Sequence, residues 1–316
     1  MLLVTGDTAF LLTDSRYAEQ AGEECPNAVL ELVRDGWMPV AERLIERLNL
    51  RRVGFEGHAL HFRDWQELQS NLGPRELTAE EDVVGHLRVV KDRSELSAIR
   101  GATRIADLAC EYICGILKPG VAERDVALRV ECFMRENGAE KEAFESIVAS
   151  GPRSALPHAK PTGRQISERE LVVLDFGARY NGYHSDITRT VLLGTPDEKQ
   201  LEVYNVVLEA QSKAIDAIRP GALGCDIDGI AREHIASKGY GEYFGHGLGH
   251  GLGLAVHEGS ILREQSDIVL QSGMVVTVEP GIYIPGWGGV RLEDDVLVAD
   301  TGAEILTKSP KVLALK

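Results

Sequence analysis

Two acidic residues flank a predicted hairpin in the middle of the chain. The segment LVVLDFGARYNGYHSDITRTVLL places Asn181-Gly182, a strong signal for a two-residue turn, between two β-rich runs. That turn sets Asp175 opposite Thr188, so Asp175 and Asp186 become diagonal neighbours on one face, about 7–8 Å apart. The apolar runs around them indicate burial, and two buried carboxylates repel each other unless a cation lies between them. The spacing therefore favours a metal site over a solvated strand face.

Histidines and glutamates occur in two further segments rich in glycine. The run FGHGLGHGLGLAVHEGS carries His246, His250 and His257, and it spells neither a dinucleotide fingerprint nor H-E-x-x-H. A lone histidine is most often a packing or surface residue, but three so close together among glycines favour a functional cluster. In VVTVEPGIYIPGWGGVRLEDDVLV, Glu279 ends a buried strand and Glu293 lies on the strand that returns. Four carboxylates and an imidazole suit manganese, cobalt, iron or zinc better than a thiolate-type zinc site does.

A repeat in the second part of the chain predicts how these residues are brought together. LKPGVAERDVALRVECFMRENG, from Leu117, aligns with IRPGALGCDIDGIAREHIASKG, from Ile218, at an offset of 101 residues (218 − 117). Downstream, LVVLDFG and VVTVEPG match again, with Asp175 and Glu279 in register. Helices followed by acid-bearing strands thus occur twice, which predicts a domain of two pseudo-symmetric halves with a site at the seam.

The elements before the repeat indicate a separate small domain. Residues 1–88 alternate short β-rich runs with helical patterns such as VAERLIERLNL, as in a small α/β domain. A long amphipathic helix follows, with Asp92 or Ser94 as its cap and Pro119-Gly120 beyond its end. We therefore expect an α+β protein with domains at 1–88 and 89–316.

Composition limits the possible partners and location. The chain has a net charge of −15 and lacks a Lys/Arg-rich run, so we expect neither a nucleic acid nor an anionic membrane as partner. No segment resembles a secretory signal or a membrane span. The five scattered cysteines contain no CxxC pair. Reduced thiols in a cytoplasmic protein are the expected state.

The acid and histidine motifs together resemble metallopeptidase family M24. The order of the motifs carries the resemblance: Asp175, Asp186 eleven residues later, HGLGHGLGLAVHE, EPGIY and GVRLEDD. It spans roughly residues 90–312 and implies a pita-bread catalytic domain. LLTDSRYAEQA resembles the creatinase-type N-terminal domain of the proline-directed branch. By comparison with that branch, this domain is expected to be short by about one strand and one helix.

The resemblance also implies a role for each site residue. Asp175 would chelate one of two divalent ions, His250 and Glu279 the other, and Asp186 and Glu293 would bridge both. Manganese is our expectation, with cobalt, zinc or iron as alternatives. A metal pair can activate water for attack on a peptide carbonyl. Glu279 would also act as the general base, and four further residues complete the implied site. Arg291 would orient a ligand carboxylate, and His257 would donate to the oxyanion. His158 would assist the departing proline nitrogen, and His246 would belong to the substrate histidines.

The implied activity is hydrolysis of Xaa-Pro bonds in di- or oligopeptides by a homodimer. An Xaa-Pro dipeptidase is our preferred interpretation, with an Xaa-Pro aminopeptidase acting on longer peptides as the alternative. A non-catalytic pita-bread binding module is a remote third possibility, and metal-free creatinase-type hydrolysis is opposed by the intact ligand set. After His257-Glu258, relatives often have Pro-Arg, whereas this chain has Ser260-Ile261-Leu262-Arg263. This difference favours an altered exit for the substrate and hence the dipeptidase.

Overall fold

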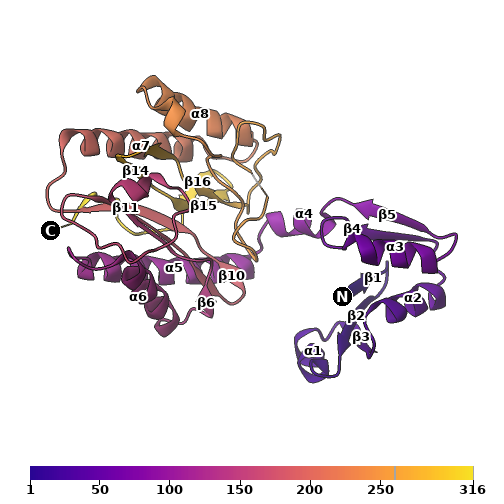
Figure 1. Ribbon diagram of the computed structural model, residues 1–316. Helices are drawn as coiled ribbons and strands as arrows, with labels where there is room; N and C mark the ends of the chain where they lie inside the picture. The colour runs from indigo at the N-terminus through magenta and orange to yellow at the C-terminus, as the bar shows by residue number, and fades with distance from the viewer. Residues whose placement is uncertain (260, 316) are drawn as a thin grey trace. The chain divides into compact units, whose positions relative to one another are not determined.

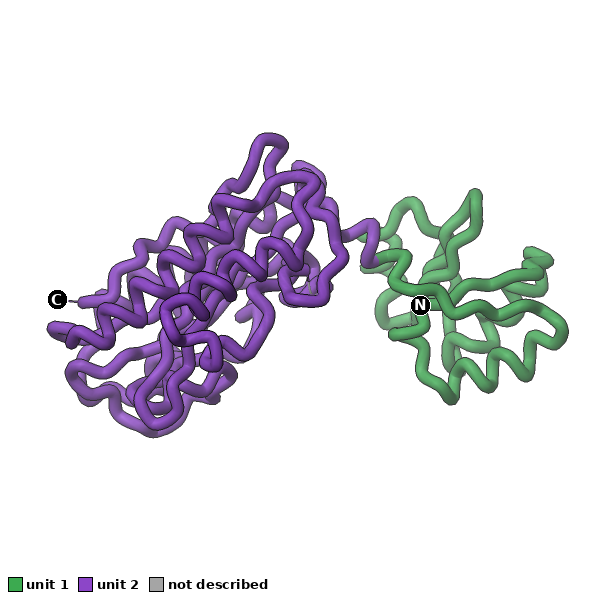
Figure 2. Tube along the Cα trace, turned by 90° about the horizontal axis from the view of Figure 1, so that it is seen from above, with its two compact units in different colours: residues 1–84 green, residues 85–316 purple. Residues whose placement is uncertain are grey.

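The protein divides into two compact units. The computed structural model describes residues 1–259 and 261–315, and its units are Met1–Val84 and Gly85–Lys316 (Figure 2). Helix α4 (Val83–Val89) runs across this division, and the predicted limit between residues 88 and 89 falls inside that helix. As a domain limit, 88/89 stays a prediction. Among the described helices, none combines the length and apolar character needed to cross a bilayer.

The first unit is the small α/β assembly predicted from the alternating pattern. Helix α2 places Val40, Leu44 and Ile45 on its inner side, and Leu44 packs with Phe10 and Leu12 of a strand. Strand β2 pairs antiparallel with β1 and parallel with β3, while β4 and β5 form a parallel pair. The elements are β1 (Leu2–Val4), β2 (Ala9–Asp14), α1 (Ala18–Glu24), β3 (Ala28–Val33), α2 (Met38–Arg47), β4 (Arg52–Glu56), α3 (Phe62–Asn71) and β5 (Glu76–Glu80).

The helices of the second unit repeat as the sequence predicts. They are α5 (Arg93–Ile116), α6 (Glu123–Glu136), α7 (Glu198–Ala217) and α8 (Gly224–Ser237). The ends of α5 and α7 lie 101 residues apart (217 − 116), as do the starts of α6 and α8 (224 − 123). The two turns between the paired helices contain Gly120 and Gly221, each with φ +87°, a conformation that favours glycine. Asp92 caps α5 with a reciprocal bond to Glu95, as expected.

The strands of the second unit also form two related hairpins. In the first hairpin, Tyr180 faces Tyr183 and Asp175 faces Thr188, which confirms the register predicted from Asn181-Gly182. In the second, Val278 faces Asp294. The strands are β6 (Lys141–Glu142), β7 (Ile147–Ser150), β8 (Leu171–Phe176), β9 (Ala178–Tyr180), β10 (Tyr183–His184), β11 (Ile187–Leu193), β12 (Val275–Val278), β13 (Gly281–Ile284), β14 (Gly288–Arg291), β15 (Asp294–Ala299), β16 (Gly302–Ile305) and β17 (Ala314–Leu315), with 3₁₀ turns at Gly151–Ala155 and Gly241–Tyr243.

Helices cover the strands on two sides. Helices α5 and α6 lie along one side of the strands and α7 and α8 along the other (Figure 1). The sheet orders are β17-β11-β8-β7, β12-β15-β16, β10-β9-β6 and β13-β14. Two apolar clusters fill the layers: Ile113 and Val130 pack with Leu174 of the first half, and Val207 packs with Val276 and Val296 of the second. Each acid-bearing hairpin is thereby held against its own helix pair.

A glycine permits a close backbone crossing beside the histidine run. A Cβ atom at Gly249 would lie 1.9 Å from the carbonyl oxygen of Thr277 on β12, well inside any tolerated contact. Backbone bonds on either side hold this crossing, from Thr277 N–H to the His250 carbonyl (2.8 Å) and from Glu279 N–H to the Leu248 carbonyl (2.8 Å). The glycine therefore allows the segment 248–250 to lie directly along β12.

We expect Gly249→Ala to lower the free energy of unfolding by about 1–3 kcal/mol, since the added methyl group must displace backbone. Gly229→Ala is the control. Gly229 lies within α8, and a Cβ atom added there would meet nothing within 4 Å. Alanine at this control position should stabilise the helix by about 0.5–1 kcal/mol. Urea unfolding of both variants measures the difference. Equal stability of Gly249→Ala and the wild-type protein would contradict the proposed tight crossing.

Candidate metal centre

The two hairpins bring four carboxylates to the seam between the halves. Asp186 directly precedes β11 and Glu293 directly precedes β15, while Asp175 lies on β8 and Glu279 directly follows β12. The halves are joined here, because Glu293 N–H donates to the Thr188 carbonyl at 3.0 Å. Asp186 N–H donates to the Asp295 carboxylate at 3.2 Å. The backbone that carries each of these two acids is thus fixed by the other half.

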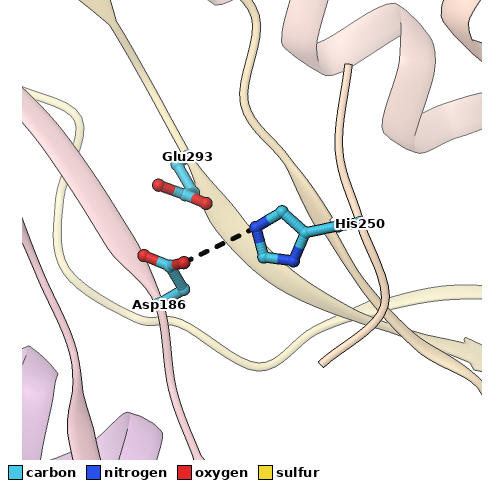
Figure 3. Close-up of side chains that lie close together, drawn as sticks. All are labelled: Asp186, His250 and Glu293. Atoms are coloured by element: carbon cyan, nitrogen blue, oxygen red, sulfur yellow. Dashed lines mark ion pairs between the residues drawn. The ribbon is translucent and has the colours of Figure 1, made fainter. Parts of the chain in front are cut away.

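The segment along β12 adds an imidazole to these acids. His250 Nδ1 lies 3.0 Å from the Gly251 carbonyl, which can only accept, so the proton resides on Nδ1. The unprotonated Nε2 then faces Asp186 Oδ2 at 3.7 Å and Glu279 Oε1 at 3.5 Å. Figure 3 shows the side chains of Asp186, His250 and Glu293 pointing toward one another. A lone pair directed at carboxylate oxygens is the arrangement that a cation stabilises.

The donor atoms fit a divalent metal. One ligand atom from each of Asp186, His250 and Glu293 lies within 4.8 Å of the others. Asp175 Oδ1, Asp186 Oδ1 and Glu293 Oε1 are buried and make no hydrogen bond to the described part of the chain. Buried carboxylate oxygens without a donor are costly unless a cation satisfies them. Oxygen-rich coordination with one imidazole suits a first-row divalent ion.

The pKa values of the acids record the same crowding of negative charge. Burial, with the charges of Glu293 and Asp175, raises the pKa of Asp186 well above its ordinary value. Burial and the charge of Glu279 do the same to the pKa of Glu293. Burial raises the pKa of Glu279 to about 8, and it lowers the pKa of His250 to about 4. The neutral imidazole is the form that can ligate a metal.

Hydrogen bonds orient two of the candidate ligand carboxylates, those of Asp175 and Glu293. The buried guanidinium of Arg291 lies 2.5 Å from Asp175 Oδ2 and 2.9 Å from the Tyr283 hydroxyl. Thr188 donates its hydroxyl to Glu293 Oε2 at 2.6 Å. Asp175 and Glu293 therefore each have one oxygen held by the protein and another left free toward the centre.

A buried ion pair supports the strand that follows Glu293. Arg189 donates to the Glu293 carbonyl at 2.5 Å and pairs with Asp294 at 2.8 Å, and both charged side chains are almost completely buried. Lys311 also reaches Asp294, at 2.5 Å. The neighbouring Asp295 accepts from Thr103 of α5 at 3.1 Å, besides Asp186 N–H. This network ties the start of β15 to β11 and to α5.

A cavity of about 700 Å³ opens onto the centre, and all nine predicted site residues line it. His257 packs its ring edge-on against that of His250, with centroids 4.1 Å apart. His246 is held on both nitrogens, by the Gly247 carbonyl at 2.7 Å and the Tyr283 hydroxyl at 3.0 Å. His158, an exposed residue, lines the same cavity from the segment that follows the 3₁₀ turn Gly151–Ala155. The structure brings the nine residues together, and their individual roles stay predictions.

Comparison with known proteins identifies the family of this chain. A model described as metallopeptidase family M24 matches residues 97–300, and one for the creatinase/prolidase N-terminal domain matches residues 1–90. This chain belongs to metallopeptidase family M24. The resemblance inferred from the motifs is therefore confirmed, as are the small creatinase-type domain and the α+β fold. Membership of the family implies divalent metal ions.

Individual relatives of this M24 protein cover nearly all of it. An Xaa-Pro dipeptidase of Pyrococcus furiosus is 43% identical, with 99% of this chain and 88% of that protein aligned. The structure of an Xaa-Pro dipeptidase from Bacillus anthracis superimposes with a TM-score of 0.96 at 43% identity, over 99% of this chain and 88% of that one. An X-Pro aminopeptidase from Thermotoga maritima gives a TM-score of 0.91 at 39% identity, over 99% and 89%.

Several residues of the M24 site were missed by sequence reasoning. Thr188 contacts the side chain of the candidate ligand Glu293, and Asp295 contacts the backbone of Asp186. Tyr283 accepts a hydrogen bond from Arg291, and Arg189 donates to the Glu293 carbonyl. A signal was available for two of these residues, since Thr188 and Asp295 each lie two positions after a ligand acid in the repeated hairpins. In the segment after Glu258, Ser260 lies outside the described residues, Ile261 and Leu262 are buried, and Arg263 lines the cavity.

We expect the chelator-treated protein to lose stability as the pH rises. The pKa of Glu279 is about 8 in the folded protein against an ordinary value of 4.5. A raised folded pKa contributes stability that is complete below about pH 4.5 and is lost as the pH rises through about 8. Added Mn²⁺ should restore stability, and more strongly at the alkaline end, because ligands must deprotonate to bind.

Urea unfolding between pH 5 and 9, with and without Mn²⁺, measures this effect. Glu279→Gln is the matched control, because it removes this titration and should flatten part of the decline. The expected sign would be contradicted if the free energy of unfolding of the chelated protein increased, relative to that of Glu279→Gln, as the pH rose over this range.

Proposed function

We propose that this M24 protein is an Xaa-Pro dipeptidase. The observation that carries the proposal is Arg263, which lines the cavity while its guanidinium makes no hydrogen bond or ion pair with the described residues. A cation in that position can bind the free carboxylate of a C-terminal proline, which a dipeptide presents close to its scissile bond. The 43% identity to the Pyrococcus furiosus Xaa-Pro dipeptidase supports the same substrate class.

The proposed cofactor is a pair of divalent ions. Asp175 would hold one ion, His250 and Glu279 the other, and Asp186 and Glu293 would bridge them. Free buried oxygens on Asp175, Asp186 and Glu293 support this assignment. When bound, such ions polarise a carbonyl and activate water near neutral pH. We propose manganese, because hard oxygen donors predominate, with cobalt, zinc or iron as alternatives.

The side chains around the ions would move the protons of hydrolysis. Glu279 would accept a proton from the water that attacks the scissile carbonyl and pass it toward the proline nitrogen, which becomes a secondary amine as the C–N bond breaks. Glu279 lines the cavity, and its Oε1 lies 3.5 Å from His250 Nε2, which places its carboxylate beside the proposed ions. His158, on the cavity wall, would assist the departing nitrogen.

The other polar residues would stabilise charge and hold geometry. His257 would donate a hydrogen bond to the oxyanion that develops on the attacked carbonyl. Arg291 would fix the Asp175 carboxylate, which it contacts at 2.5 Å. His246, held on both nitrogens, would shape the substrate side of the cavity. These are separate roles, and each one predicts a different kinetic effect when the residue is replaced.

The assignments of His257 and His250 predict opposite metal contents. His257→Ala should keep both metal ions and lower kcat by roughly 10²–10³, the cost of one oxyanion donor. His250→Ala should lose metal instead, because it removes a ligand. Metal analysis beside steady-state kinetics separates the two. Metal loss from His257→Ala would show that His257 helps to hold metal, and an unchanged kcat would show that it packs against the site without stabilising the transition state.

The second candidate is an Xaa-Pro aminopeptidase, favoured by the 0.91 TM-score with the Thermotoga maritima X-Pro aminopeptidase.

We expect kcat/KM for Ala-Pro to exceed that for Ala-Pro-Ala at least tenfold, with activity lost on chelation and restored by Mn²⁺. Arg263→Ala should raise KM for Ala-Pro by about ten- to a hundredfold, as for a lost charge-assisted pair, and Arg263→Lys should recover part of it. Preference for the tripeptide would assign the protein to the aminopeptidases, and full activity without metal would refute both candidates.

The proposal extends to the setting in which the enzyme acts. We place it in the cytoplasm, where thiols stay reduced, and the five free cysteines support this location. A homodimer acting on proline-containing peptides, without nucleic-acid or membrane partners, accords with the net charge of −15 and with the family resemblance. The remote alternative of a non-catalytic binding module is disfavoured by the complete ligand set.

A further inference from the structure

A buried carboxylate outside the metal centre is surrounded by cations. The side chain of Glu258 is 7% exposed. Its Oε1 contacts the guanidinium of Arg88, whose Nε lies 3.1 Å away, and its Oε2 lies 3.2 Å from the ammonium of Lys91. Ala255 N–H donates to the same carboxylate at 3.1 Å. None of these four residues is among those that line the cavity at the metal centre.

The contacts of Glu258 fix the loop that carries His257. Glu258 N–H donates to the Gly251 carbonyl at 2.8 Å, and Gly251 N–H donates to the Gly259 carbonyl at 3.1 Å. A Cβ atom at Gly253 would lie 2.5 Å from Glu258 Oε2, so glycine lets the carboxylate pack beneath the loop. The side chain of Glu258 therefore fills the inside of the loop, whereas His257, its immediate neighbour in sequence, faces the cavity and the ring of His250.

The cations come from the segment where the chain enters the second unit. Arg88 belongs to α4, and Lys91 lies between α4 and α5. The backbone of this segment is itself fixed, because Lys91 N–H donates to the Gly273 carbonyl at 2.9 Å and Val90 pairs with Met274 just before β12. Lys91 is buried, with its side chain 2% exposed, and it also donates to the Val89 carbonyl at 3.1 Å. The charges that hold Glu258 thus stand on a backbone that is itself hydrogen-bonded in place.

Electrostatics keep this carboxylate ionised. Burial by itself raises the pKa of Glu258, but the charges of Lys91 and Arg88 outweigh it and lower that pKa overall. A buried carboxylate that contacts two cations and a backbone donor has a fixed orientation, since each oxygen has its own partners. Removing the negative charge would leave the ammonium of Lys91 buried without its counter-ion, and the loop would lose its anchor.

We propose that Glu258 is a positioning residue that holds the His257 imidazole at the metal centre through its ion pairs with Arg88 and Lys91. The inference rests on the proposed role of His257 in stabilising the transition state. Misplacing a donor that acts in the transition state lowers kcat and leaves substrate binding nearly intact. The segment at the start of the second unit is thereby part of the support of the active site.

A double-mutant cycle tests this role. Glu258→Gln in the wild-type background should keep its metal and its KM while lowering kcat about ten- to a hundredfold, as for other supporting residues of metal sites. In the His257→Ala background the same substitution should leave kcat unchanged, because the group that it positions is gone. Glu304→Gln is the matched control. It breaks the exposed ion pair with Arg100, whose side chains are 45% and 43% exposed, and it should alter kcat in neither background.

Each outcome decides the question. An equal fall of kcat in both backgrounds, or no fall in either, would overturn the inference. If His257→Ala by itself leaves kcat unchanged, the proposed role of His257 fails, which is a separate result. Should Glu258→Gln not fold, Arg88→Gln replaces it, because Arg88 is 34% exposed and its loss leaves the Lys91 pair in place. Arg88→Gln should lower kcat by a smaller factor, and only when His257 is present. The absence of this dependence on His257 would refute the proposal.

Discussion

The mutual repulsion of four buried carboxylates is the constraint on which the rest of the structure depends. Asp175, Asp186, Glu279 and Glu293 converge on one cavity, where burial raises the pKa of each of them. Neighbouring acids raise the pKa values of Asp186, Glu279 and Glu293 further, and cations would relieve this repulsion. The fold must oppose this repulsion during folding as well as in the finished enzyme. It does so with extended β hairpins, close backbone crossings and buried cations placed behind the acids, as Arg189 and Arg291 illustrate.

The two repeated halves of the second unit each contribute carboxylates, but their supporting side chains differ. Thr188 and Asp295 occupy equivalent positions after Asp186 and Glu293, yet Thr188 donates through its hydroxyl while Asp295 accepts from a backbone N–H. The single histidine of the proposed ligand set comes from the second half alone. Equivalent backbone with different side chains would give the two proposed metal positions unequal ligand sets.

Local sequence was enough to predict what local geometry determines. Asn181-Gly182 gave the register that faces Asp175 with Thr188, and the period of the repeat gave the paired helices. The supporting contacts depend on segments that meet only in the folded chain. Arg88 and Glu258 are 170 residues apart, and neither lies in a pattern that marks it as buried. Local sequence does not determine the roles of His158 and His257 either, because a histidine's role depends on which groups face its ring in the folded chain.

The division of ligands between the halves has a consequence for how such a site could arise. In the proposed ligand set, the first half provides two aspartates and the second provides two glutamates and a histidine, so neither half alone would surround a pair of cations. A polypeptide that carried only one of these halves would have needed a second copy, related by a two-fold axis passing between the ions. Fusion of the two copies would have removed the dependence on concentration. It would also have freed each half to acquire its own mutations, including the imidazole that breaks the symmetry.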